Sequence, residues 1–328
     1  MDVPLVVAMR IGVALPSYGN DDWRFPTGAL EAYADDAERL GFSGLWVMEH
    51  LLQPPGRSYS WLDPLTTLAT MVGSTNRVEL GTSVLLLPLR KPVLAAHRAA
   101  SLQHLSDERL TLGLGIGWSE REYAAAEVPF EERGPRFTEA IELFRRLLHE
   151  DTVTFDGEFY TVEDVRLEPS TPRPPRILIG GGGIEQNGQR SVPVAVKDRI
   201  ARHADGWIAG ADPPDAVEQD WHDIADHVAA AGEDPATLDR VVLQRAYLVP
   251  GADAATACEK QRSVFGRKAD PETAMAEYLT GTVADVRQAL GAYRDMGVDQ
   301  VILDPVTPRP PEARDQLQRY ATHLTDVP

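Results

Sequence analysis

The sequence predicts an α/β fold, a single (β/α)8 barrel with insertions at its carboxyl-terminal mouth. Short apolar runs rich in Val, Ile and Leu alternate with longer amphipathic stretches, as buried parallel strands alternate with helices. About eight such strand-helix units fit into 328 residues, which favours a closed barrel over an open sheet. We therefore expect one domain over residues 1–328, preceded by an N-terminal extension at residues 1–8.

The apolar runs predict the strands, and the amphipathic stretches between them predict the helices. The expected strands are residues 9–15, 44–48, 78–87, 110–116, 176–180, 206–209, 240–249 and 298–303. The expected helices are residues 27–40, 63–74, 91–105, 132–150, 194–203, 214–231 and 282–296, with one more at the end. Thr27 is the expected N-cap of the first helix, which Gly41 closes. Asp63-Pro64 predicts a cap followed by proline at the first helical position.

Two segments are longer than ordinary barrel connections. Residues 151–175 contain Val153 to Tyr160, which predicts a β-hairpin with a turn at Asp156-Gly157. Residues 250–281 are polar and are expected to be partly helical. Connections of this length are usually lids or binding loops, so both insertions are expected near the barrel mouth.

Charge and cysteine content limit the class of partner. The chain has 32 Lys and Arg against 50 Asp and Glu, a net charge of −18. This balance argues against nucleic acid and against an anionic membrane surface as partners. A single cysteine, Cys258, excludes an internal disulfide framework and a cysteine-rich metal site. No apolar run approaches the ~20 residues of a membrane span. A cytoplasmic enzyme with a small-molecule substrate is the expectation.

The second strand ends in Glu49-His50, at the barrel end where catalytic residues lie. His50 is the best candidate for proton transfer, because the histidine pKa lies near neutrality. The alternative is a histidine that only packs at the strand end. The other histidines fall on expected helices, and no HxH or HExxH spacing occurs. No metal site is therefore expected.

The third and fourth strands carry glycines and small residues. Gly81 inside a strand indicates a bulge or a close backbone approach to a ligand, and Thr82-Ser83 would admit a flat ring or simply pack. Residues 113–118 read GLGIGW and begin like a dinucleotide fingerprint. The rest of that motif is missing, so a Rossmann fold is rejected. Glu122 is a candidate acid, with a solvated glutamate on a helix face as its alternative.

The fifth strand runs into four glycines, at residues 180–183. Backbone N–H groups of such a segment form a nest that suits a phosphate, whereas the alternative is a flexible loop. Arg190 and Lys197 are the nearby cations that would assist. No Gly-Lys-Ser/Thr follows, so the segment is not a Walker A loop.

These pieces together resemble the bacterial luciferase-like flavin and deazaflavin oxidoreductases, and the coenzyme F420-dependent branch most. The resemblance rests on the order and spacing of short strings over ~200 residues: Met9 to Val13, Ala37 to Phe42, Leu45 to His50, Asp63 to Thr66, Val78 to Leu87, Pro92 to Leu94, Leu102 to Ser106 with Arg109-Leu110, Gly115 to Trp118, Val128 to Gly134 and Ala201 to Trp207. It implies a barrel that holds a flavin-type ring at its mouth and orients it over a substrate.

The resemblance also implies roles for particular residues. The ring would pack on a bulged third strand with a non-proline cis peptide at Ser83-Val84, near His50. The remaining cofactor contacts would be Ile116, Gly117 and Trp118 at the ring or ribityl chain, Gly181, Gly182 and Gly183 at the phosphate end, and Arg190 and Lys197 beside it. Residues 184–193 look inserted relative to the family, so the phosphate contacts are expected to depart from the family's pattern, and the segment is expected to be an extra element for the cofactor tail or a lid.

The function implied is hydride transfer between F420 and a small organic substrate, with His50 exchanging a proton and Glu49 or Glu122 assisting. Two alternatives remain open: an FMN-dependent monooxygenase that uses O2, and a non-catalytic flavin- or deazaflavin-binding protein. The family resemblance also implies a homodimer, with the helices after strands two and three as the expected interface. Substrate contacts are expected from residues 53–59, from the hairpin near Phe155 and from residues 250–281.

Overall fold

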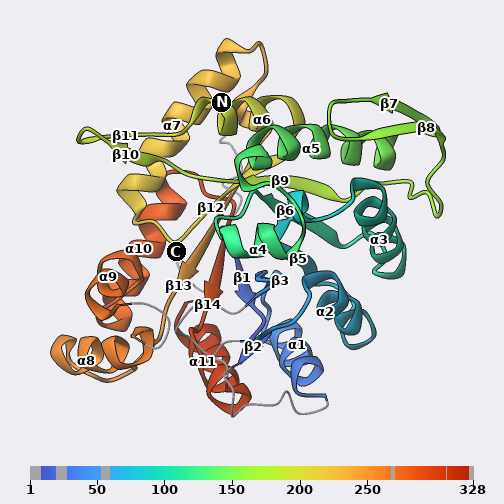
Figure 1. The fold of residues 1–328 in the computed structure, drawn as a ribbon. Coiled ribbons are helices and arrows are strands. Elements are labelled where there is room, and N and C mark those ends of the chain that lie inside the picture. Colours follow the sequence, from blue (N-terminus) through green and yellow to red (C-terminus); the bar gives the residue numbers. More distant parts are fainter. Residues whose placement is uncertain (1–8, 20–27, 53–59, 267–269, 308, 325–328) are drawn as a thin grey trace, which may run out of the picture.

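A closed barrel of eight parallel strands forms the centre of the molecule (Figure 1). The structure is a computed structural model that describes residues 9–19, 28–52, 60–266, 270–307 and 309–324. Around the barrel the strand order is β1-β14-β13-β12-β9-β6-β5-β3. The barrel strands are β1 (Arg10–Ala14), β3 (Gly44–Val47), β5 (Glu79–Leu86), β6 (Leu110–Gly115), β9 (Arg176–Gly180), β12 (Gly206–Ala209), β13 (Asp239–Arg245) and β14 (Gln300–Asp304). The predicted (β/α)8 barrel is confirmed.

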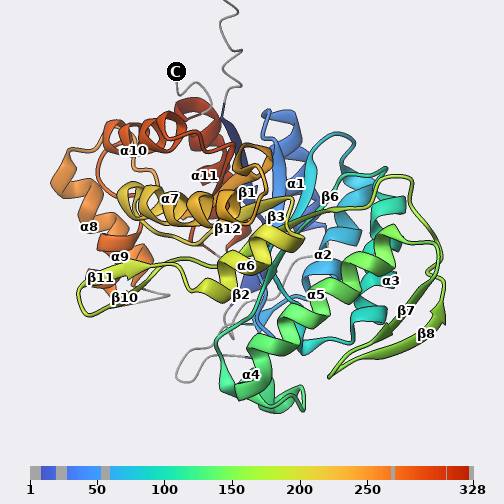
Figure 2. The same cartoon turned by 90° about the horizontal axis from the view of Figure 1, so that it is seen from above.

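Helices surround the barrel (Figure 1), and the view turned by 90° shows α5, α6 and α7 along one side of it (Figure 2). They are α1 (Ala29–Arg39), α2 (Pro64–Met71), α3 (Pro92–Leu105), α4 (Glu120–Ala125), α5 (Arg133–His149), α6 (Val194–His203), α7 (Pro214–Ala230), α8 (Ala254–Phe265), α9 (Pro271–Glu277), α10 (Val283–Asp295) and α11 (Pro310–His323). Short 3-10 turns are η1 (Val72–Ser74), η2 (Leu87–Leu89), η3 (Phe130–Glu132) and η4 (Pro235–Thr237). Among the described residues, no helix is long and apolar enough to cross a membrane.

The helix signals in the sequence are confirmed where the structure describes them. The Asp63 carboxylate accepts a hydrogen bond from the Thr66 N–H at the start of α2, with Pro64 as the first helical residue. Gly41 follows α1 with a φ of 91°, in the left-handed region that favours glycine. Thr27, the expected cap of α1, lies outside the described residues, as does the expected extension at residues 1–8.

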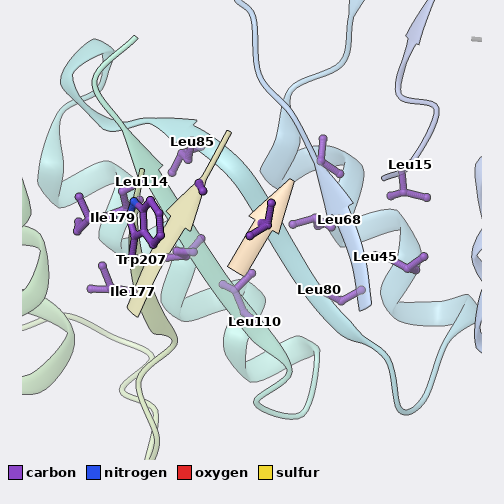
Figure 3. Packing of buried hydrophobic residues seen from close by; sticks show 14 of the residues in the cluster. Leu15, Leu45, Leu68, Leu80, Leu85, Leu110, Leu114, Ile177, Ile179 and Trp207 are labelled. Atoms are coloured by element: carbon purple, nitrogen blue, oxygen red, sulfur yellow. The ribbon is translucent and has the colours of Figure 1, made fainter. Parts of the chain in front are cut away.

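Apolar side chains between strands and helices form the main core, part of which is drawn in Figure 3. Inside the barrel, Trp46 fills the space that glycines leave. A Cβ atom would lie 2.9 Å from the Trp46 ring at Gly12, 2.8 Å at Gly44 and 2.3 Å at Gly81. Gly81 therefore approaches Trp46 of the neighbouring strand β3 and not a ligand, whereas the bulge that Gly81 also predicted follows directly after it, between Thr82 and Leu85. Small residues on three strands thus match one large side chain, which keeps the barrel interior packed.

Two hairpins project from opposite sides of the barrel (Figures 1 and 2). The first pairs β7 (Val153–Asp156) with β8 (Thr161–Val165), so the expected hairpin within 153–160 is wrong in the placement of its second strand. The reason is a longer turn, whose N–H groups at Glu158, Phe159 and Tyr160 all donate to the Glu139 carboxylate on α5. The second hairpin, β10 (Ile184–Gln186) with β11 (Gln189–Ser191), lies within residues 184–193, the segment expected to be an insertion. A small ladder joins β2 (Tyr18–Gly19) to β4 (Ser60–Trp61).

Candidate active site

A cavity of about 960 Å³ opens at the carboxyl ends of the barrel strands, where active sites of (β/α)8 barrels lie. It brings together residues that the sequence places far apart, including the catalytic candidates and most cofactor candidates. The predicted residues that line it are Glu49, His50, Ser83, Val84, Ile116, Gly117, Trp118, Glu122, Gly181, Gly182 and Gly183. Arg190 and Lys197 are not among the lining residues.

Strand β5 enters the cavity with a bulge. Its register against β6 shifts between Thr82 and Leu85, and the Ser83-Val84 peptide bond is cis. Glycines on β6 make room for this bulge, because a Cβ on Gly113 would lie 2.2 Å from the Thr82 carbonyl oxygen. A Cβ on Gly115 would lie 2.2 Å from Val84 Cγ2. The glycine pattern that mimics a dinucleotide fingerprint therefore serves the close packing of β5 on β6.

This packing predicts the effect of a single methyl group. We expect Gly115→Ala to lower the free energy of unfolding by about 1–3 kcal/mol, the usual cost of overpacking a tight core. Gly291→Ala is the matched control, because nothing lies within 4 Å of its Cβ position in α10. The control should be neutral or slightly stabilising, since alanine is favoured in helices. Urea unfolding measures both, and equal stability of Gly115→Ala and wild type would contradict the account.

His50 follows β3 and is fixed by a carboxylate and two indoles. Its Nδ1 lies 3.3 Å from Oε1 and 3.4 Å from Oε2 of Glu122. Its ring centroid lies 5.1 Å from that of Trp61 and 5.6 Å from that of Trp118, the latter edge-on. In the described part of the chain Nε2 has no hydrogen-bond partner. The ring is thus oriented through Nδ1, which leaves Nε2 for a reacting group.

Glu122 lies on α4 and is only 2% exposed, so its reading as a solvated glutamate is wrong. Its Oε1 accepts hydrogen bonds from the N–H of Leu51 at 2.6 Å and of Leu52 at 3.1 Å. A carboxylate that already receives two donors acts as the acceptor for the His50 Nδ1–H. The same side chain therefore fixes both the segment after β3 and the tautomer of His50.

Glu49 points to a different partner. Its Oε2 accepts hydrogen bonds from the Leu86 N–H at 2.6 Å and from Arg90 at 3.0 Å, and Arg90 also contacts Oε1. Arg90 in turn binds Asp63 at 3.0 Å. Burial raises the pKa of Glu49, and the charge of Arg90 opposes that shift. Glu49 therefore connects the ends of β3 and β5, which is a positioning role.

The glycine segment after β9 is held by hydrogen bonds and flanked by charge. The Gly183 N–H donates to Asp220 Oδ2 at 2.7 Å, and Trp207 Nε1–H donates to the Gly181 carbonyl at 2.5 Å. Arg190 binds both oxygens of Asp220 at 2.8 Å and lies 3.2 Å from Asp212. The hydrogen bond to Asp220 raises the pKa of Arg190. The β10–β11 hairpin thus brings a cation to the glycines, with two carboxylates already beside it.

Lys197 lies away from the cavity. Its Nζ donates to Asp223 Oδ1 at 2.5 Å, and Asp223 Oδ2 accepts from the Val192 N–H at 2.8 Å. Burial acts to raise the pKa of Asp223, but these hydrogen bonds hold it below its usual value. Lys197 therefore secures the base of the β10–β11 hairpin on α7.

The cavity wall fits a flat ring with polar edges. Val84, Leu86 and Ile116 supply an apolar face. Ser83 Oγ and Trp61 Nε1 are buried and have no hydrogen-bond partner within the described ranges. Unpaired buried polar groups are costly, so a ligand with hydrogen-bonding edges would satisfy them. A flavin or deazaflavin ring has this character, and the residues present fit it.

Sequence reasoning missed Arg245 and Tyr278, which also line the cavity. The predicted strand 240–249 placed Arg245 in mid-strand, whereas β13 ends there and opens onto the mouth. Residues 250–281 contribute Tyr278, in agreement with their expected place near the mouth. Residues 151–175 contribute no lining residue, so their expected place there is wrong; their hairpin packs on α5 instead. The expected contacts at residues 53–59 lie outside the described part.

The fold and the cavity define a class: a (β/α)8 barrel whose bulged third strand borders a ligand cavity at the mouth. The chain belongs to the family of luciferase-like monooxygenases, which matches residues 1–325. Among the described residues, no group of three or more His, Cys, Asp or Glu could hold a metal ion.

Three known proteins illustrate the similarity. The chain is 33% identical over 244 residues to the F420-dependent hydroxymycolic acid dehydrogenase of Mycobacterium tuberculosis, covering 71% of this chain and 62% of that protein. An F420-dependent secondary alcohol dehydrogenase solved with an F420-acetone adduct superposes with a TM-score of 0.81 at 16% identity, over 98% and 99% of the two chains. A monooxygenase from Streptomyces bottropensis superposes with a TM-score of 0.76 at 25% identity, over 96% and 98%.

The match to the dehydrogenase is partial, since the chain spans about three-fifths of that relative's length. The family and the fold follow from these comparisons.

Proposed function

We propose that this chain is an oxidoreductase that transfers a hydride between coenzyme F420 and a small organic substrate. The observation that carries the proposal is the His50–Glu122 pair, at 3.3 Å, which lines the same cavity as the bulge of β5. A histidine held through one nitrogen with the other open is suited to exchange a proton with a substrate oxygen. The relative named F420-dependent hydroxymycolic acid dehydrogenase supports the choice of cofactor.

Hydride chemistry would come from the bound deazaflavin, which carries the hydride when reduced. The chain supplies orientation, exclusion of water and a proton. The cofactor ring would pack against the bulge at Ser83-Val84. Trp61 and Trp118 lie next to the His50 ring, and the His50 side chain is only 21% exposed to water. His50 Nε2 holds or accepts the proton that accompanies the hydride.

FMN-dependent monooxygenation is the second candidate, and one observation favours it. Arg190 beside the glycines is surrounded by Asp220 and Asp212, so the local charge is negative. A negative surrounding opposes a polyanionic F420 tail more than it opposes a single phosphate. The similarity to the monooxygenase from Streptomyces bottropensis agrees with this alternative.

Arg190 and Lys197 differ in their position relative to the glycines, because only Arg190 lies next to them. We expect Arg190→Ala to weaken F420 binding about tenfold, because its guanidinium flanks Gly182 and Gly183 and charge-assisted bonds contribute ~1.5–3 kcal/mol. Lys197→Ala should change the affinity less, since Asp223 holds that side chain outside the cavity lining. Fluorescence titration at two salt concentrations measures both, with the larger effect at low salt. Equal losses in the two variants would contradict this assignment.

The proposed function is tested by anaerobic turnover. Purified protein is incubated with F420 and a panel of alcohols, and with reduced F420 and the matching ketones and aldehydes. We expect a substrate-dependent change of the F420 absorbance without oxygen. Turnover that requires reduced FMN and O2 would replace the proposal with the second candidate.

We also propose that the protein is a cytoplasmic homodimer. On α3, Leu94 and Leu105 are 59% and 63% exposed, and an interface on this helix would remove both apolar side chains from water. This helix follows the third barrel strand, as the expected interface does.

A further inference from the structure

The cavity has a second half that the proposed cofactor contacts leave unassigned. Its walls come from the ends of β12 and β13 and from Tyr278, which follows α9. They combine apolar residues, Ile208, Ala209 and Leu243, with one cation, Arg245. We propose that Arg245 binds an anionic group of the substrate, a carboxylate or a phosphate ester. This inference rests on the proposed function, because it assumes that the substrate shares the cavity with the cofactor.

The Arg245 guanidinium is held in place by its neighbours, but they do not use all of its hydrogen-bond donors. It is the last residue of β13, and its side chain is 24% exposed. Its Nε lies 3.5 Å from Asp304 Oδ2 and forms no hydrogen bond within the described ranges. The guanidinium lies over the Tyr278 ring, with Cζ 4.8 Å from the centroid. One carboxylate edge and one aromatic face thus fix the group, which leaves its Nη donors for a ligand.

The nearby carboxylate of Asp304 does not prevent Arg245 from binding an anion. Its Oδ1 accepts hydrogen bonds from the Val306 N–H at 2.8 Å and from the Tyr18 hydroxyl at 3.2 Å. The carboxylate is only 1% exposed, so it is shared among groups of the barrel wall. Arg245 makes only the longer contact with it, at 3.5 Å. Asp304 therefore serves as a support behind the arginine.

The other charged groups of the cavity have closer partners. Glu49 is bound by Arg90, Glu122 by two backbone N–H groups and His50, and Asp212 by Arg190. Arg245 is the one lysine or arginine among the lining residues that the structure describes. Since the whole chain carries a net charge of −18, an anion needs a local cation to enter the cavity. An arginine fork matches carboxylate and phosphate oxygens in pairs.

The shape of this half indicates the rest of the substrate. Apolar side chains surround the arginine, and the Tyr278 ring lies beside it. A molecule with an apolar body and one anionic end would bury the body against Leu243 and Ile208. Its anionic end would then lie on Arg245, and its reactive end would face the bulge and His50.

The test uses a pair of probes that differ in charge and little in shape, benzoate and benzyl alcohol. Calorimetry of the full chain without cofactor compares wild type, Arg245→Gln and Arg245→Lys. Arg166→Gln is the control, because it makes the same charge change at an exposed pair with Glu168. We expect benzoate to bind at least ten times more weakly to Arg245→Gln. Arg245→Lys should fall between, and Arg166→Gln should match wild type.

Benzyl alcohol should bind all four proteins alike. The proposal is overturned if Arg245→Gln binds benzoate within twofold of wild type, or if benzyl alcohol loses the same affinity. If Arg245→Gln does not fold, Arg245→Lys decides, because it keeps the charge and loses the fork. An unchanged benzoate affinity in that variant would also overturn the proposal. The benzoate result needs no cofactor, so its failure is distinguishable from failure of the F420 proposal.

Discussion

Replacement of His50 by alanine should abolish most turnover and leave cofactor binding nearly intact. The ring is held by Glu122 at 3.3 Å and packs between Trp61 and Trp118, so it is placed for chemistry at the cavity. General acid-base catalysis by a positioned group contributes about 10²- to 10⁴-fold, and a loss in this range is expected. Turnover is measured with any substrate found in the anaerobic panel, and cofactor affinity by fluorescence.

His97→Ala provides the matched control, because His97 is exposed on α3 and is not among the residues that line the cavity. It should behave as wild type in both assays. A His50→Ala variant that keeps turnover within threefold would remove the proton-transfer role. A variant that loses cofactor binding along with turnover would show a role in cavity structure instead.

Changes at Glu122 should separate catalysis from stability. In Glu122→Gln the amide oxygen can still accept from the N–H of Leu51 and Leu52. The amide NH2 would then face His50 Nδ1 and favour the wrong tautomer. We expect turnover to fall about 10- to 100-fold, as when a partner that orients a histidine is removed. The free energy of unfolding should change little.

Glu122→Ala should lower both the turnover and the free energy of unfolding. Two backbone donors in a buried site would lack an acceptor, which costs about 1–3 kcal/mol each when no water replaces it. Glu120→Gln is the control, because Glu120 is exposed on the same helix. Urea unfolding and turnover assays are carried out on both Glu122 variants and on the control. Equal turnover of Glu122→Gln and wild type would mean that the carboxylate acts only as a structural cap.

Much of the fold could be predicted because it depends on local patterns. Apolar runs such as residues 110–116 mark strands buried on both faces, and their number and spacing indicate a closed barrel. The turn of the first hairpin was misplaced because its geometry depends on Glu139, which lies on α5 and is distant in sequence. The end of β13 was misplaced because an apolar run continues past Arg245 into an irregular segment.

The site could be predicted only in part. His50 and Glu49 follow a strand, so their position at the mouth is a consequence of topology. The partners of Glu122, Arg190 and Lys197 come from other elements, and no local pattern reveals them. Sequence alone therefore indicates a candidate acid at Glu122 without showing that it is buried against His50. It also indicates cations near the glycines without showing that Asp220 and Asp223 already bind them.

The net charge of −18 has a local consequence. It opposes the approach of any anion, so binding of an anionic cofactor or substrate depends on single cations. We propose that Arg190 beside the glycines and Arg245 in the second half of the cavity supply these cations. Each is assigned to a different ligand, and each is tested by its own variant.

The central claim, that the cavity is built for the deazaflavin F420, is tested most directly by equilibrium titration. Purified protein is titrated with F420 and, separately, with FMN under the same salt and pH, and binding is followed by fluorescence. The account predicts micromolar or tighter binding of F420 and weaker binding of FMN. Micromolar binding of FMN together with no detectable binding of F420 would contradict it.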